Sequence, residues 1–157
     1  MKKKIIAIIG SFILLLGIIP MIPMETVQAK EATSVDGSLL LDEVEESAGQ
    51  MLPESRGQYL QTGSCKIIKA GTGKITVGGT TIAQKQVSSI KVTIMLERLV
   101  NGNWVSYDSW SASKSNAYSV TVSKTLSVPR GYYYRVLSIH NANSDRSRSN
   151  TNALYVS

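Results

Sequence analysis

Residues 91–110 read KVTIMLERLVNGNWVSYDSW, and this stretch decides the fold. Apolar side chains at every second position from Val92 to Leu96 alternate with other side chains, which predicts a strand with one buried face. Asn101-Gly102 follows directly, and both residue types tolerate the positive φ that a two-residue hairpin turn requires. Residues 104–110 are then the returning strand. The stretch therefore predicts an antiparallel hairpin.

The period of two continues on both sides of this hairpin, and no helical periodicity competes with it. Polar, Gly-rich or Pro-containing turn segments separate the apolar runs at short intervals, as in Pro129-Arg130-Gly131. The remaining strands are expected at 64–70, 74–83, 118–123, 132–140 and 153–156. We therefore predict an all-β fold, an antiparallel β-sandwich of about seven strands.

The first 29 residues have the composition of a signal peptide. Three lysines, Lys2 to Lys4, precede an apolar run from Ile5 to Ile19. This run is shorter than the roughly 20 apolar residues of a spanning helix. Small side chains at Val27 and Ala29 predict cleavage after Ala29. The alternative is an uncleaved anchor from Ile5 to Met24, although Pro20 and Pro23 lie in the half of it that would have to span.

Charge divides the rest of the chain into two parts. Residues 30–57 contain seven acids and two bases, with a single short apolar patch around Leu40, and predict a disordered linker or a removable pro-segment. Residues 58–157 contain three acids and twelve bases and form the predicted sandwich domain. Such an excess of positive charge attracts polyanions. A cell-wall polyanion, a glycan or an anionic membrane surface are the expected partners, and no dedicated nucleic-acid motif is present. The sequence leaves the oligomeric state open.

The turn from Leu126 to Val136 resembles the corresponding turn of immunoglobulin-like and fibronectin type III domains. In those domains a leucine, a Pro/Gly turn and a tyrosine precede a Tyr-x-Val strand. The resemblance implies that Tyr132, Tyr133 or Tyr134 bonds its hydroxyl to the backbone of the preceding turn. The core Cys pair of antibody domains is missing, because Cys65 is the only cysteine.

The hairpin 92–110 and the strand 131–136, GYYYRV, also resemble a family of small secreted proteins of Gram-positive bacteria that has no assigned function. The resemblance covers most of residues 58–157. It implies the fold and carries no catalytic residue with it.

Few residues are suited to catalysis or metal binding. His140 is the only histidine. It is expected among exposed polar residues near Asp145, and neither this pair nor a Cys65–His140 pair forms a convincing catalytic arrangement. Glu97 and Asp108 flank the hairpin and are predicted to be ordinary surface charges, because Arg98 lies beside Glu97; a carboxylate pair is the geometrically possible alternative. Residues 141–145 supply oxygen atoms but a single carboxylate, which argues against calcium. We expect no enzyme activity, no metal and no cofactor.

Cys65 falls in a predicted strand, where a small buried apolar side chain is the expected role, and a dimer crosslink or a reactive thiol are the alternatives.

The aromatic residues of the hairpin are candidates for ligand contact. Trp104 and Trp110 are separated by an even number of residues and are expected on one sheet face, with Val105 and Tyr107 on the core side. The two tryptophans are either exposed for stacking on sugar rings or packed in the core. The predicted ligand-binding residues are Trp104, Trp110, Lys91, Arg98 and Arg135.

Together these patterns predict a secreted, non-enzymatic binding or envelope-associated module for an extracellular polyanion or glycan. The alternative is a secreted antimicrobial or toxin-like protein whose acidic segment is removed.

Overall fold

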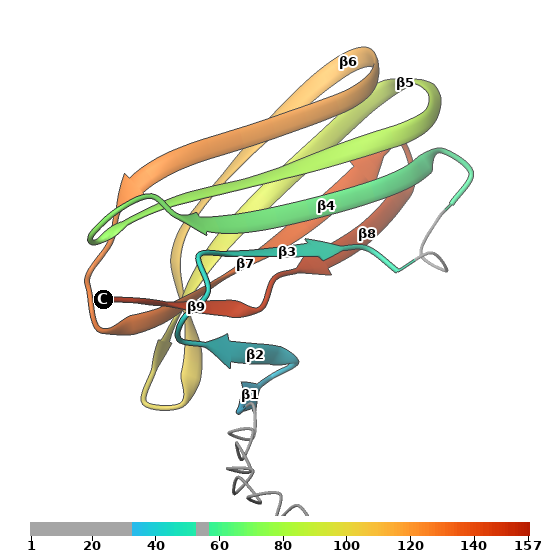
Figure 1. Ribbon diagram of the computed structural model, residues 1–157. Coiled ribbons are helices and arrows are strands. Elements are labelled where there is room, and N and C mark those ends of the chain that lie inside the picture. Colours follow the sequence, from blue (N-terminus) through green and yellow to red (C-terminus); the bar gives the residue numbers. More distant parts are fainter. Residues whose placement is uncertain (1–32, 53–56) are drawn as a thin grey trace, which may run out of the picture. The chain divides into compact units, whose positions relative to one another are not determined.

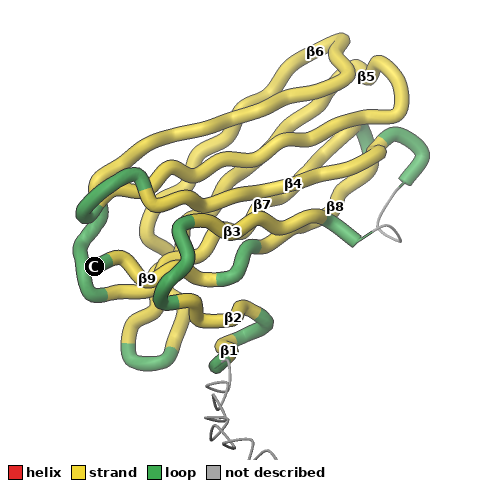
Figure 2. The backbone as a smooth tube through the Cα atoms, viewed as in Figure 1, coloured by secondary structure: helices red, strands yellow, loops and turns green. Residues whose placement is uncertain are grey.

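The computed structural model describes residues 33–52 and 57–157, and these residues form strands and connecting turns (Figures 1 and 2). The predicted signal peptide lies outside the described residues. Within the described part of the chain, no helix is long and apolar enough to cross a membrane. The strands, in chain order, are β1 (Ser34–Val35), β2 (Ser38–Leu41), β3 (Glu46–Gln50), β4 (Leu60–Lys69), β5 (Lys74–Val100), β6 (Asn103–Ser127), β7 (Tyr132–Ala142), β8 (Asp145–Asn150) and β9 (Ala153–Val156).

The strands form one mixed sheet that curls into a half-barrel, and the predicted all-β fold is confirmed. The order is β1-β2-β9-β7-β5-β4-β3, with β6 paired to β5 and β8 paired to β7. Every pair is antiparallel except β2 with β9. Figure 1 shows the long ribbons of β5 and β6 running side by side along the whole domain.

Two long strands connect the two layers of the half-barrel. The first part of β5 pairs with β4, and the second part pairs with β7, with a register irregularity between Ile82 and Val87. The strands expected at 74–83 and 91–96 are therefore one strand, and those expected at 104–110 and 118–123 are joined in β6. The alternation of apolar residues predicted each half as a separate strand. The reason is that the register irregularity interrupts this alternation, although the backbone remains a strand on both sides of it.

The turn predicted at Asn101-Gly102 is present. Their φ angles are 49° and 78°, and Val100 pairs with Asn103 as a two-residue hairpin requires. A second expected feature is also present, because the Tyr134 hydroxyl donates a 2.7 Å hydrogen bond to the Pro129 carbonyl in the preceding turn.

The segment predicted to be a disordered linker is ordered over residues 33–52, which corrects that prediction. β3 pairs with β4 over five residues, and β2 pairs with β9. Backbone pairing at a sheet edge does not need a continuous apolar side, so acidic composition did not prevent it. Cations also compensate part of the charge, as in the ion pair of Lys69 with Glu45. One local signal was present, since Asp36-Gly37 forms the turn between β1 and β2 with φ angles of 49° and 75°.

The core lies between the two layers. Alternate side chains of β5, from Ile90 to Leu96, are fully buried against side chains of β4 and β7. Cys65 is 2% exposed within this core, as predicted for a small buried side chain, and burial raises the pKa of its thiol. Of the candidate binding residues, Lys91, Trp104 and Arg135 lie on the opposite faces of these strands, whereas Trp110 and Arg98 lie on the face that carries the core.

Candidate functional site

The two tryptophans lie on opposite faces of the sheet, which corrects the prediction that they share one. Trp110 pairs with the core-facing Ile94, whereas Trp104 pairs with the outward Leu99. Between them the register shifts by one residue, because Leu96 pairs with Asp108 and Glu97 pairs with Ser106. Tyr107 is the extra residue of this β-bulge, and a bulge reverses the faces of all positions beyond it.

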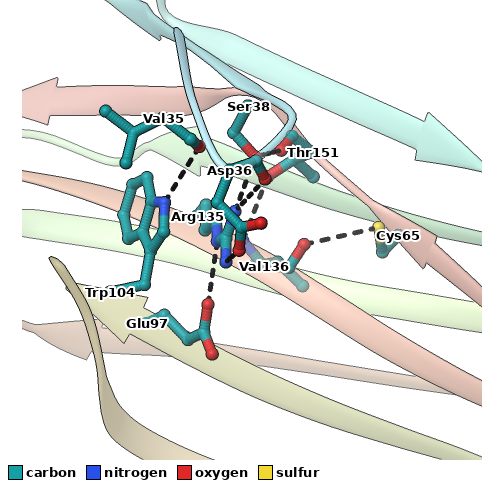
Figure 3. Close-up of polar contacts among 9 residues, drawn as sticks. All are labelled: Val35, Asp36, Ser38, Cys65, Glu97, Trp104, Arg135, Val136 and Thr151. Carbon is teal, nitrogen blue, oxygen red and sulfur yellow. Dashed lines mark hydrogen bonds and ion pairs between the residues drawn. The ribbon is translucent and has the colours of Figure 1, made fainter. Parts of the chain in front are cut away.

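Trp104 belongs to a polar cluster around Arg135, which Figure 3 shows at its centre. Arg135 is 4% exposed, although its side chain starts on the outward face of β7. Its Nε donates to Glu97 at 2.8 Å, and its Nη2 donates to the Asp36 carboxylate at 3.0 Å. Its Nη1 also donates to the Asp36 carbonyl and to the Ser38 hydroxyl. The guanidinium therefore makes four hydrogen bonds within the chain, and all three of its nitrogens take part.

This cluster attaches the β1–β2 hairpin to the main sheet. The Arg135 guanidinium lies 4.3 Å from the centre of the Trp104 ring, and the indole Nε1 of Trp104 donates to the Val35 carbonyl at 3.1 Å. Asp36 and Ser38, from the same hairpin, bind Arg135 from the other side (Figure 3). Trp104 and Arg135, both predicted to contact ligand, are thus used in holding two parts of the fold together.

Trp110 packs at the margin of the core, where β6 covers the open side of the half-barrel. The tryptophan is half-buried, and Lys124 lies 4.9 Å from the centre of its ring. Lys124 also forms a 3.0 Å ion pair with Asp108, which lowers the pKa of that carboxyl. Trp110 therefore closes the core together with the Lys124–Asp108 pair.

Arg98 lies in a different environment from Arg135. Its guanidinium carbon is 4.5 Å from the centre of the Tyr132 ring and 5.5 Å from that of Tyr107. Among the described residues, no carboxylate lies within ion-pair distance of Arg98, and its Nε is buried without a hydrogen-bond partner. Arg98 is half-buried, and the rings of Tyr107 and Tyr132 beside it are 37% and 36% exposed.

Lys91 lies on an exposed basic surface that the sequence analysis had identified only in part. It pairs with Asn141 of β7, and Asn141 pairs with Arg146 of β8, so the three side chains form one cross-strand row on the outward face. Arg148 lies on the same face, two residues along β8. We call Lys91, Arg146 and Arg148 the basic face. All three are exposed, and none forms an ion pair with another described residue.

Acidic side chains gather at the other end of the same outward face. Glu97 lies six residues from Lys91 along β5, which is about 20 Å in an extended strand. Asp36 joins Glu97 there through Arg135. Asp42 accepts a short hydrogen bond from the Tyr133 hydroxyl, which raises the pKa of Tyr133 to about 12. The outward face therefore carries positive charge at the end with Lys91 and negative charge at the end with Glu97.

The histidine considered for catalysis is fully buried, which corrects the expectation of an exposed residue. His140 shares the inward face of β7 with Tyr134 and Val136, and it is 0% exposed. Its Nδ1 is 2.9 Å from the Thr81 hydroxyl and its Nε2 is 2.8 Å from the Ser149 hydroxyl. Burial lowers the pKa of His140 to about 4, so the ring is neutral at physiological pH.

The acidic candidates have structural partners. Asp145 accepts hydrogen bonds from the backbone N–H groups of Tyr59 and Leu60, at 2.6 and 2.9 Å, and these bonds lower its pKa. Glu97 and Asp108 lie on opposite faces of the sheet because of the bulge, so they do not form a carboxylate pair. Within the described residues no group of three His, Cys, Asp or Glu side chains is arranged to hold a metal ion.

Four residues at the candidate surfaces were missed in the sequence analysis, namely Tyr107, Tyr132, Arg146 and Arg148. Exposed Arg146 and Arg148 alternate with buried Ser147 and Ser149, which is the pattern of a strand, but no strand was predicted between residues 140 and 153. The position of Tyr107 depends on the bulge, for which the sequence carries no local mark.

The comparisons with known proteins give a family and no function. A search among curated proteins finds no match for this chain. A family model described as a family of unknown function (DUF6147) matches residues 29–155. This range includes all described strands except Val156, the last residue of β9. The chain therefore belongs to the DUF6147 family of unknown function.

Proposed function

We propose that this protein is a secreted, non-enzymatic module that binds an extracellular polyanion through the basic face. Export rests on the leader-like sequence of Lys2–Lys4, the apolar run that follows and the small residue Ala29. Outside a Gram-positive cell, the anionic polymers of the wall are the most abundant ligands of this kind. The bond from Tyr134 to the turn carbonyl of Pro129 supports a module of the immunoglobulin or fibronectin III type.

The observation that carries the proposal is that, within residues 33–52 and 57–157, no acid forms an ion pair with the basic face. Lys91 and Arg146 are two strands apart, which places their Cα atoms about 10 Å from each other. Arg148 lies beside them on the same face. Three exposed cations at this spacing attract a linear polyanion. When they neutralise its charges, the counterions condensed on the polymer are released, and this release adds to the affinity.

The apolar side chains next to these cations support a surface that contacts a polymer over some length. Thr93, Met95, Leu137 and Ile139 are half-buried on the same outward face, between the basic face and Glu97. The acidic end then limits the direction in which an anionic chain is able to lie, because Asp36 and Glu97 repel it. A bound polymer would therefore run across β5, β7 and β8 rather than along them.

Chromatography on a phosphate-bearing cation-exchange matrix tests this proposal. The triple variant Lys91→Gln, Arg146→Gln, Arg148→Gln is compared with a control triple variant, Lys66→Gln, Lys74→Gln, Lys114→Gln. All six residues are exposed and form no ion pair with another described residue, so both variants lose the same charge. We expect the basic-face variant to elute at a clearly lower salt concentration than the control.

Equal elution of the two variants would show that only net charge matters and would overturn the assignment to this face. In cells, a moderate-salt wash should release the protein from the envelope, because such contacts are screened by salt. Retention that ignores salt would contradict electrostatic binding.

A further inference from the structure

A second arginine site lies on the opposite sheet face from the basic face. The guanidinium of Arg98 lies over the rings of both Tyr107 and Tyr132, and we call these three residues the tyrosine–arginine clamp. Arg98 and Lys91 are an odd number of residues apart on β5, so their side chains leave the strand on opposite faces. The clamp is therefore separate from the surface proposed above, and the inference does not rest on that proposal.

Three separate features of the fold build the clamp. Arg98 pairs with Tyr134 on β7 and with Val105 on β6. The bulge adds Tyr107 to this side of the sheet, where its ring meets that of Tyr134 edge-on at 5.7 Å. Gly131, with φ of 85°, ends the turn that delivers Tyr132 to the start of β7. The backbone at the bulge and at the Gly131 turn therefore determines where the two rings lie.

Comparison with Arg135 shows what the clamp lacks. Each guanidinium stacks on aromatic rings, but that of Arg135 also binds the carboxylates of Asp36 and Glu97. Arg98 has no carboxylate within ion-pair distance among the described residues, and its Nε is buried without a partner. A half-buried guanidinium that lacks a counterion gains more from an incoming anion than one in bulk water.

The surroundings of Arg98 narrow the class of ligand. β5 is paired on one side with β6 and on the other with β7 at this position, so no free backbone edge beside Arg98 can receive a peptide strand. Tyr107, Tyr132 and Val105 nevertheless expose apolar surface, with Val105 47% exposed. A ligand that uses both features carries an anionic group, such as a carboxylate, together with a compact ring that packs on aromatic carbon.

We infer that the tyrosine–arginine clamp binds a carboxylated sugar residue. The carboxylate pairs with the terminal nitrogens of Arg98, which offer the planar, forked geometry that carboxylates match. The C–H face of the sugar ring packs on the exposed tyrosine rings and on Val105. The clamp would then select acidic sugar units in a glycan, independently of any polyanion on the other face.

Titration of the full mature chain with glucuronate, glucose and acetate, followed by tyrosine NMR signals, tests this inference. We expect saturable shifts with glucuronate at millimolar concentration, and binding at least about tenfold weaker for glucose and for acetate. Arg98→Gln should abolish the glucuronate shifts, and Arg98→Lys should weaken binding about tenfold, because lysine keeps the charge but lacks the fork. Tyr132→Phe should retain binding and Tyr132→Ala should weaken it.

The basic-face triple variant serves as the control, and it should bind glucuronate like the unmodified chain. Unfolding temperatures of all variants are measured in parallel. If Arg98→Gln does not fold, the binding data of Arg98→Lys and Tyr132→Phe are used in its place. Equal affinity for acetate and glucuronate would overturn the sugar contact. Glucuronate binding that survives Arg98→Gln, or tighter binding of an acidic peptide than of glucuronate, would overturn the site.

Discussion

Acidification should destabilise this protein through one residue, His140. The ring is fully buried between the hydroxyls of Thr81 and Ser149, with no carboxylate bonded to either nitrogen. Burial lowers the pKa of His140 from 6.5 to about 4. The unfolded chain therefore binds a proton at a pH at which the folded protein does not, and between these two values stability must fall as the pH falls.

The size of the effect follows from the two pKa values. The contribution of His140 is fully present above about pH 6.5 and is lost progressively down to about pH 4. The difference corresponds to about 3 kcal/mol of unfolding free energy, at about 1.4 kcal/mol for each pH unit between them. For a domain of this size that is a large part of the total stability. The carboxylates whose pKa is lowered, Asp108 and Asp145, act below about pH 4 and so do not obscure this window.

Urea denaturation between pH 4.5 and 7.5, followed by tryptophan fluorescence, measures this loss. The control is His140→Gln, in which an amide replaces the only histidine, so the contribution of the imidazole is removed and that of every other group is kept. The variant should be less stable at pH 7 but should show a nearly flat pH dependence from 4.5 to 6.5. A parallel slope in the variant, or an NMR titration of His140 with a midpoint near 6.5, would refute the reasoning.

Three further changes test other parts of the structure. Arg135→Met should lower the unfolding free energy by about 3 kcal/mol in urea denaturation, because it leaves the half-buried Glu97 without its cation; a change below about 1 kcal/mol would contradict the proposed role of the cluster. Gly63→Ala should lower the unfolding temperature by several degrees, because a Cβ there would overlap the His140 ring. Gly71→Ala should lower the unfolding temperature by less, because this position is exposed and has open space, although its φ is positive. A chain that starts at Gln58 lacks β1, β2 and β3 and should not fold stably, so N-terminal sequencing of the secreted protein should find a start near residue 30; a stable, secreted form that begins near 58 would instead favour a removable pro-segment.

The features that could be predicted from the sequence are those that neighbouring residues determine. The Asn101-Gly102 turn depends on two residues and was found at the expected place with the expected pairing. The bond of Tyr134 to the preceding turn was implied by a short resemblance. His140 was predicted to be exposed because it is polar, although it shares the even positions of β7 with Tyr134 and Val136, which are buried.

The features that could not be predicted depend on contacts between distant segments. The bulge at Tyr107 arises from the register between β5 and β6, and it decides which face each tryptophan and each hairpin carboxylate occupies. The burial of Arg135 depends on Asp36, nearly one hundred residues earlier in the chain. The sequence therefore predicted which types of residue form the candidate surfaces. Which of these residues lie together depends on the register of the strands.

The most direct test of polyanion binding at the basic face is the salt dependence of affinity for inorganic polyphosphate, measured by calorimetry between about 50 and 200 mM salt. We expect the slope of log affinity against log salt to be reduced by about two to three in the Lys91, Arg146 and Arg148 triple variant, since each lost phosphate contact removes somewhat less than one. The control variant at Lys66, Lys74 and Lys114 should keep nearly the original slope. Equal slopes in the two variants, or no measurable binding by the unmodified protein at low salt, would contradict the account.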